Sequence, residues 1–223
     1  MTGKLFGVGL GPGDPELMTL KAVRILREVA VVALPLTNGK NQMALNIAAD
    51  YLVGKSILYL NMPMLTDKKE LESYYDAAFK RIRCQLERGV SVAYLTLGDP
   101  SLYSSFIYLR RRAQQAGYPT QTVAGVPSFC AVAARAQVSL AEGAEEVTIL
   151  PAPYVTEPLP RGNLVIMKVG RHFDPLCQML GTRLDRAVLV ENCGLPRERV
   201  IIPRSKEKPQ SYFSTMIVKQ GGS

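Results

Sequence analysis

Residues 7–22, GVGLGPGDPELMTLKA, decide the fold. They close a short apolar run at 5–10 with a turn rich in glycine and proline, and a helical pattern follows directly. This order is typical of a strand that leads into a helix. Glycines in such a turn allow positive φ angles and a close approach to a ligand or a neighbouring loop. Taken alone, the turn favours a structural role.

The same alternation continues along the chain. Further strands are predicted at 29–34, 56–61 and 90–97, and helices at 41–51, 68–87 and 102–116. In the helix after the first turn, Leu20, Val23 and Leu26 are expected to share a face, with Asp14 or Thr19 as its cap. Beyond 117–119 strands dominate, at 120–124, 147–150, 164–169, 187–191, 200–202 and 212–218, with helices at 128–136 and 175–180.

These patterns predict an α/β fold with mainly parallel strands and two α/β domains. The first domain, 1–118, alternates strands and helices. The second, 119–223, is a strand-rich α+β layer.

Composition excludes several classes of protein. The 223 residues include 27 Lys and Arg against 19 Asp and Glu, which gives a net charge of +8, and 47% of them are hydrophobic. That hydrophobic content excludes intrinsic disorder. The charge leaves nucleic acid, a membrane surface and a small polyanion open as partners. The longest apolar run, 29–36, is much shorter than the about 20 residues of a membrane span. We expect a soluble, cytoplasmic protein that does not bind a membrane.

The cysteines do not indicate a metal site. No two of Cys84, Cys130, Cys177 and Cys193 have a C-x-x-C spacing, and His172 is the only histidine. This set fits neither a familiar zinc site nor a disulfide framework. We expect a reducing compartment and no bound metal.

Familiar nucleotide motifs fail on this chain. The dinucleotide fingerprint starts with Gly7 and Gly9 but meets Pro12 where its last glycine belongs. The acid that should follow the second strand is missing from residues 33–36. A phosphate loop fails as well, because Ala49 stands where its first glycine is required.

A second loop, 95–105, reads LTLGDPSLYSS and follows the fourth predicted strand. It repeats the Gly-Asp-Pro of residues 13–15 at 98–100, and a third Gly/Pro element, AGVPSF, covers 124–129. Ligands of open parallel sheets bind beyond the carboxyl ends of the strands. We therefore expect the three loops to face one cleft between the two halves.

Read together, these elements resemble the tetrapyrrole (corrin/porphyrin) methyltransferases, nearly from end to end. The segments that carry the resemblance are 7–22, 95–109 (LTLGDPSLYSSFIYL), 124–134 (AGVPSFCAVAA) and 140–151 (LAEGAEEVTILP). The last three look like the branch that methylates carbon 20 of precorrin-2 or cobalt-factor II in cobalamin synthesis. The chain departs from that branch at Ser105, where we expect Thr.

The resemblance implies S-adenosylmethionine as cofactor, a tetrapyrrole substrate, a non-Rossmann fold with a cofactor cleft between its domains, and a homodimer. Carried over to this sequence, it implies cofactor contacts at Leu97, Gly98, Asp99, Tyr103, Ser104, Ser128, Phe129, Met167, Asn192, Cys193 and Ser214. It places Pro12 on the substrate side. Lys168 and Arg171 are candidates for the substrate carboxylates, as are Arg110, Arg111 and Arg112, although that triplet equally fits a solvated helix face.

A methyl sulfonium is already an activated electrophile, so the protein mainly has to orient the reactants and exclude water. This agrees with the lack of a convincing Cys/His or Ser/His pair. A carboxylate such as Asp99 or a substrate group accepts the proton, and the sequence does not choose between them. His172 fits a capping or surface role at least as well as catalysis.

Alternatives remain open at this point. One is a relative of the same fold that methylates another tetrapyrrole position. A nucleic-acid-binding protein would explain the charge, but the aromatic residues are not interleaved with basic ones as in a stacking platform. A non-catalytic nucleotide-binding module lacks the acid and lysine that such sites use.

Overall fold

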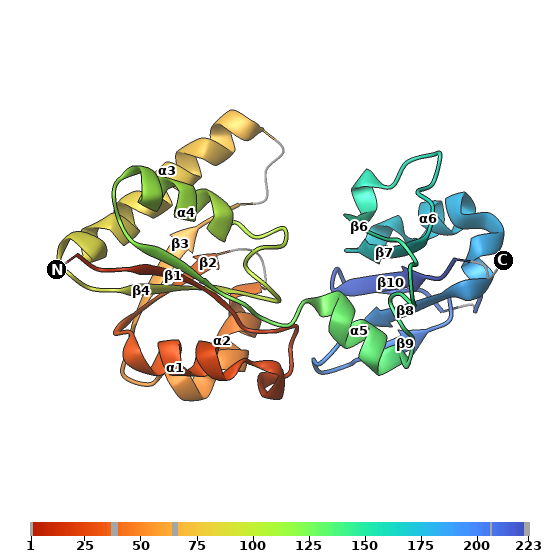
Figure 1. The fold of residues 1–223 in the computed structure, drawn as a ribbon, viewed down its shortest axis with the longest axis horizontal. Coiled ribbons are helices and arrows are strands. Elements are labelled where there is room, and N and C mark those ends of the chain that lie inside the picture. The colour runs from red at the N-terminus through yellow and green to blue at the C-terminus, as the bar shows by residue number, and fades with distance from the viewer. Residues whose placement is uncertain (1, 37–39, 64–66, 206, 221–223) are drawn as a thin grey trace. The chain divides into compact units, whose positions relative to one another are not determined.

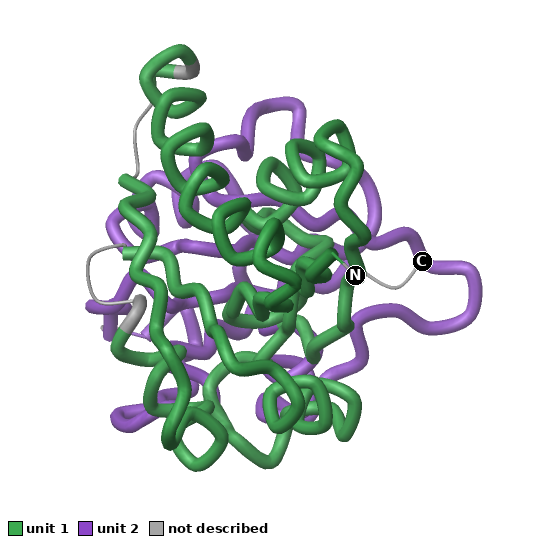
Figure 2. Tube along the Cα trace, turned by 90° about the vertical axis from the view of Figure 1, so that its left-hand side faces the viewer, with its two compact units in different colours: residues 1–127 green, residues 128–223 purple. Residues whose placement is uncertain are grey.

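The computed structural model describes residues 2–36, 40–63, 67–205 and 207–220. The chain divides into two compact units, 1–127 and 128–223, which Figure 2 shows in green and purple. The division lies further along the chain than the predicted boundary after residue 118. The reason is that Thr120–Val123 pairs with the first strand, so it belongs to the sheet of the first unit.

The first unit is a parallel sheet covered by helices on both faces (Figure 1). Its strands are β1 (Leu5–Gly9), β2 (Val31–Leu36), β3 (Ser56–Asn61), β4 (Val92–Thr96) and β5 (Thr120–Val123), in the spatial order β3-β2-β4-β1-β5. Its helices are η1 (Pro15–Leu17), α1 (Leu20–Glu28), α2 (Lys40–Leu52), α3 (Lys68–Glu87) and α4 (Phe106–Gln115).

Both faces of this sheet are apolar. In β4, Ala93 and Leu95 pack with α1 and α2, whereas Val92 and Tyr94 pack with α3 and α4. Because alternate side chains of a strand point to opposite faces, a strand buried on both sides reads as a continuous apolar run. This is why these strands could be found in the sequence.

The start of α1 differs from the prediction in two ways. Asp14 and Thr19 cap different helices, Asp14 the short η1 and Thr19 the α1 helix. The expectation that Leu20 lies on the buried face of α1 is wrong, because its side chain is 88% exposed. The buried face consists of Ala22, Ile25 and Leu26.

The second unit is a mixed sheet between two helices. Its strands are β6 (Val147–Pro151), β7 (Asn163–Met167), β8 (Ala187–Glu191), β9 (Arg199–Ile201) and β10 (Ser214–Val218), in the order β6-β7-β10-β8-β9. Among the described strands of this unit, only β6 and β7 pair in parallel; β10 is antiparallel to β7 and β8, and β9 is antiparallel to β8. Its helices are α5 (Ser128–Ala136), η2 (Ala152–Tyr154), η3 (Gly170–His172), α6 (Phe173–Leu180) and η4 (Gly181–Arg186).

The two larger helices cover opposite faces of this sheet (Figure 1). Along β10, Met216 and Val218 pack with α6, whereas Ile217 packs with α5. Within the described ranges, no helix combines the length and apolar character that crossing a membrane requires.

Candidate functional site

Three loops of the first unit meet at one edge of its sheet. They follow β1, β4 and β5, which are neighbouring parallel strands, so their carboxyl ends lie together. The first two loops pair backbone to backbone: the Gly98 N–H donates to the Gly11 carbonyl at 2.7 Å, and the Leu10 N–H to the Thr96 carbonyl at 2.9 Å. The first two predicted Gly/Pro loops are therefore brought together within this unit.

Glycine is required where these loops touch. A Cβ on Gly125 would lie 2.2 Å from the Gly98 carbonyl oxygen and 2.8 Å from the Gly9 Cα. Gly98 itself has a φ of 70°, a region that side chains with a Cβ rarely adopt. The glycines thus allow three backbones to come closer than any other residue would permit.

Asp99 ties the second loop to the third. One carboxylate oxygen accepts the Gly125 N–H at 2.9 Å, and the other accepts the Ser101 N–H at 2.7 Å and the Ser101 hydroxyl. Partial burial opposes the charged form, but these hydrogen bonds outweigh it and lower the pKa of Asp99 below its ordinary value. Asp99 is therefore an anion at neutral pH with both oxygens engaged, which makes it a poor proton acceptor.

The other predicted residues of the second loop differ in what they offer. The Ser104 hydroxyl lies 3.0 Å from that of Thr96 and accepts the Phe106 N–H at 3.2 Å, so it holds the loop in place. Tyr103 is 50% exposed and has a φ of 49°, which lies outside the helical region, and α4 begins at Phe106. Leu97 packs partly on the core of the α1 and α2 face, and Pro12 is half-buried.

The predicted residues of the second unit also share one edge of their sheet. The β10 register pairs Ser214 with Glu191 and Thr215 with Met167, so the end of β7, the end of β8 and the start of β10 are adjacent. Asn192 follows β8 with a φ of 54° and donates its N–H to the Phe213 carbonyl at 2.7 Å. Ser214 is 1% exposed.

Three further predicted residues belong to helix α5 or pack near it: Ser128, Phe129 and Cys193. Ser128 and Phe129 form its first turn and are half-buried. Cys193 packs partly against the cluster that α5 forms with β8 and β10, and burial, together with nearby Glu198, raises the pKa of its thiol to about 11. Because the thiol stays protonated at neutral pH, Cys193 is not an activated nucleophile.

The basic candidates fall into two groups. Lys168 is half-buried with a φ of 60°, and burial lowers its pKa; Arg171 is exposed, with its Nε 3.4 Å from the His172 Nε2. Lys168 follows directly after β7, and Arg171 lies in η3 shortly beyond it. Arg112, in contrast, is only 16% exposed on its side chain, where it pairs with Glu72 and Asp76 of α3.

Arg112 also lies over the Tyr75 ring, with its Cζ 5.5 Å from the ring centroid. It therefore holds α4 against α3, which favours the helix-face interpretation of the Arg triplet. Arg110 and Arg111 are exposed on the same helix.

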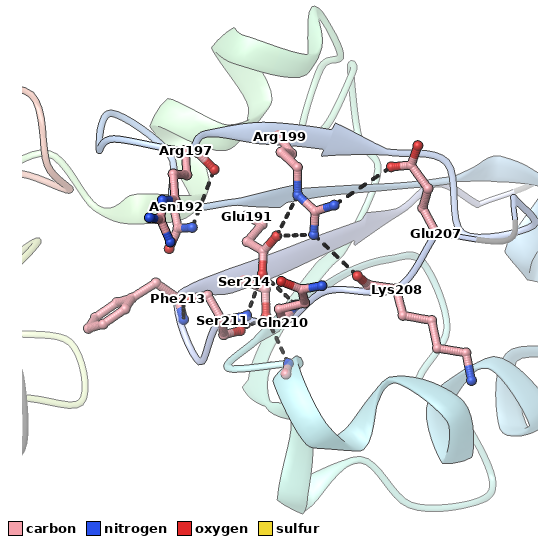
Figure 3. Close-up of polar contacts among 11 residues, drawn as sticks. Glu191, Asn192, Arg197, Arg199, Glu207, Lys208, Gln210, Ser211, Phe213 and Ser214 are labelled. Carbon is pink, nitrogen blue, oxygen red and sulfur yellow. Dashed lines mark hydrogen bonds and ion pairs between the residues drawn. The ribbon is translucent and has the colours of Figure 1, made fainter.

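The site residues that the resemblance implies include Asn192 and Cys193 but not Glu191, which holds the strand ends of the second unit together. This carboxylate ends β8 and is 2% exposed (Figure 3). It accepts the Gln210 N–H at 2.6 Å, the Ser211 N–H, and the Arg199 Nε at 2.9 Å. A charged residue at the end of an apolar strand was the available signal, but the backbone groups that it binds leave no trace in the sequence.

The described residues contain no group of three or more His, Cys, Asp or Glu side chains placed to hold a metal ion.

Two curated relatives match this chain from end to end. A probable cobalt-precorrin-2 C(20)-methyltransferase of Methanocaldococcus jannaschii is 33% identical and covers 97% of this chain and 96% of its own length. The cobalt-precorrin-2 C(20)-methyltransferase of Salmonella typhimurium is 32% identical and covers 99% of this chain and 98% of its own length.

The fold is shared with a solved structure. The uroporphyrin-III C-methyltransferase of Thermus thermophilus, complexed with S-adenyl homocysteine, aligns with a TM-score of 0.71 at 23% identity, over 97% of both chains.

The family profile described as tetrapyrrole (corrin/porphyrin) methylases matches residues 4–209. With these relatives, that match confirms the expected α/β fold and the expected enzyme class. The chain belongs to the tetrapyrrole (corrin/porphyrin) methylases and is a C-methyltransferase.

Proposed function

We propose that this enzyme transfers a methyl group from S-adenosylmethionine to carbon 20 of precorrin-2 or its cobalt form, in cobalamin biosynthesis. The observation that carries the proposal is the end-to-end similarity to two relatives that are both named for this position. A relative that methylates another tetrapyrrole position is the second candidate, because it would share the family and the fold.

The residues present fit the cofactor. S-adenosylmethionine, when bound, supplies a methyl group on a positively charged sulfur. The anionic Asp99 complements such a charge electrostatically, and the half-buried Leu97 and half-exposed Tyr103 beside it offer apolar surface for a methionine chain. Residues 31–36 of β2 carry no carboxylate, so a Rossmann-type contact to a ribose has no counterpart in that strand.

The loops of the first unit are proposed to bind the methionine and ribose portions through Leu97, Gly98, Asp99, Tyr103 and Ser104. Their backbone contacts hold this geometry before any ligand arrives, which reduces the ordering cost of binding. The second unit is proposed to hold the adenine side through Met167, Asn192, Cys193 and Ser214, and Ser128 and Phe129 to extend the first set.

Lys168 and Arg171 are proposed to bind carboxylates of the tetrapyrrole, and Pro12 to lie on the substrate side. A half-buried ammonium such as Lys168 has lost part of its hydration, so a substrate carboxylate would stabilise its charged form. With Asp99 engaged on both oxygens, we assign no proton acceptor on the protein.

Calorimetry with S-adenosylhomocysteine tests the cofactor directly. We expect binding at or below about micromolar concentrations, an affinity that stabilises the folded chain measurably. If S-adenosylhomocysteine at saturating concentration produces neither heat of binding nor a rise in Tm, the proposed cofactor is rejected.

We also propose that the enzyme acts in the cytoplasm as a homodimer. Sedimentation equilibrium tests the second point, and a mass that stays at the 24.5 kDa of one chain across micromolar concentrations would reject it.

A further inference from the structure

The buried carboxylate of Glu191 lies at the start of a continuous series of hydrogen bonds. It holds the N–H groups of Gln210 and Ser211, and the Ser211 carbonyl then accepts the Ser214 hydroxyl at 3.0 Å. The same hydroxyl accepts the Gly170 N–H at 2.8 Å. Figure 3 shows this series running from β8 through the segment before β10.

The series fixes all three strand ends of this edge. The Ser214 carbonyl accepts the Val169 N–H at 3.1 Å, which sets the turn after β7. The Phe213 carbonyl accepts the Asn192 N–H at 2.7 Å, which sets the turn after β8. Segment 210–214 is thus bonded to both neighbouring turns, and Glu191 bonds its first residues.

Ion pairing also restrains the carboxylate. Arg199 of β9 donates from Nε at 2.9 Å and from Nη2 at 2.5 Å, and the same Nη2 donates to the Lys208 carbonyl at 3.2 Å. Although desolvation opposes the charge, Arg199 and the two backbone N–H groups lower the pKa of Glu191. The pair is buried at its carboxylate end, since Glu191 is 2% exposed and Arg199 is 38% exposed. A buried charge that loses its partner is costly, so the carboxylate is held where Arg199 and the N–H groups meet it.

We propose that Glu191 is a positioning residue for the cofactor: it fixes segment 210–214 and, through it, Asn192, Ser214 and the turn that follows Met167. The inference rests on the proposed function, because Met167, Asn192 and Ser214 are three of the four proposed adenine-side contacts. Glu191 itself is 2% exposed, so it acts on the proposed contacts through its hydrogen bonds to the segment. In Figure 3 its carboxylate is directed at Arg199 and the segment, and the Phe213 ring extends away from it.

The test compares two isosteric variants of the full chain. Glu191→Gln replaces one acceptor oxygen with a donor that faces N–H groups, and we expect it to weaken S-adenosylhomocysteine about tenfold or more. The control is Glu145→Gln. Glu145 also accepts several hydrogen bonds, from Asn163 Nδ2 at 2.8 Å and Lys219 Nζ at 3.0 Å, but these lie at the opposite end of β7 and β10.

Glu145→Gln should lower the free energy of unfolding and leave the affinity for S-adenosylhomocysteine within about twofold of wild type.

Two further variants separate the positioning of segment 210–214 from the ion pair with Arg199. Glu191→Asp keeps the charge and should bind with intermediate affinity; if Glu191→Gln does not fold, Glu191→Asp carries the comparison. Glu191→Gln combined with Arg199→Gln removes the unpaired guanidinium and should recover stability but not affinity.

Wild-type affinity in Glu191→Gln, or full recovery of affinity in the double variant, would overturn the inference. Amide hydrogen exchange across 208–214 gives an independent readout, since exchange there should accelerate in Glu191→Gln and not in Glu145→Gln. If the wild-type chain itself fails to bind S-adenosylhomocysteine, the proposed function fails, and unchanged exchange would still refute the role of Glu191.

Discussion

Gly125 is the residue whose replacement tests the contact of the three loops most simply. Gly125→Ala puts a Cβ 2.2 Å from the Gly98 carbonyl oxygen, so backbone must move. We expect a loss of about 1–3 kcal/mol in the free energy of unfolding, as for other overpacked sites. We also expect weaker binding of S-adenosylhomocysteine, measured by calorimetry.

Gly3→Ala is the matched control, because its Cβ would also lie 2.2 Å from a backbone oxygen, that of Val90. Gly3 precedes β1, at the other end of the strand from the loops. It should lower stability by a similar amount without changing affinity. Equal affinity losses in both variants would contradict the placement.

Asp99 gives the loops a pH dependence whose sign follows from its lowered pKa. Its stabilising contribution is complete above the unfolded pKa of about 3.9 and is lost as pH falls through the lower folded value. Asp99→Asn should therefore lower stability at neutral pH, by about 1–3 kcal/mol for unsatisfied N–H groups. The difference from wild type should shrink below about pH 4, measured by denaturant unfolding. A difference that is constant with pH would exclude this role.

Lys168 gives a second pH dependence, that of KM for the tetrapyrrole at alkaline pH. Because burial lowers its pKa, its charge is lost at a lower pH than that of an exposed lysine. If Lys168 binds a substrate carboxylate, KM for the tetrapyrrole rises as pH passes through this value. Lys168→Arg should remove that rise, because arginine keeps its charge. Lys168→Met should raise KM about tenfold at neutral pH. An unchanged KM in Lys168→Met would remove Lys168 from the substrate site.

At the scale of elements, the cap of α1 couples a helix to a loop. The Thr19 hydroxyl accepts the Ala22 N–H at 3.2 Å and lies 3.2 Å from the Ala124 carbonyl, to which it donates. Thr19→Ala should reduce stability by about 1 kcal/mol and also weaken S-adenosylhomocysteine binding, because Ala124 precedes Gly125.

Asp67→Ala is the control for that prediction. Asp67 caps α3 by accepting the Lys69 N–H at 2.8 Å, and none of its described hydrogen bonds reaches the three loops. It should reduce stability by a similar amount and leave binding intact. A loss of affinity in Asp67→Ala would show that stability alone controls binding.

The elements also show what the sequence could predict. The predicted bounds of α3, α5 and β8 agree with the structure, since a cap or a run of apolar residues marks them. The pattern misplaces Leu20 because residues spaced by three drift around a helix, so Leu20 and Leu26 lie about 120° apart. Helix α4 begins at Phe106 and not at residue 102 as predicted, because the left-handed conformation of Tyr103 is not visible in the sequence.

For the whole molecule, the site was only partly predictable. The Gly-Asp-Pro loops could be found because glycines and prolines mark strand ends, and the structure brings these loops together in the first unit. Glu191 could not, because its partners are backbone groups at Gln210 and Ser211 and an arginine on another strand. The net charge of +8 fits a polycarboxylate substrate and does not identify one.

The position of the transferred methyl group tests the central claim most directly. The enzyme is incubated anaerobically with precorrin-2, or with its cobalt form, and with S-adenosylmethionine labelled in its methyl group. The labelled carbon of the product is then located by NMR. We predict label at carbon 20 alone. Label at another ring position would keep the family and contradict the proposed reaction, and a tetrapyrrole left without label in both incubations would contradict it as well.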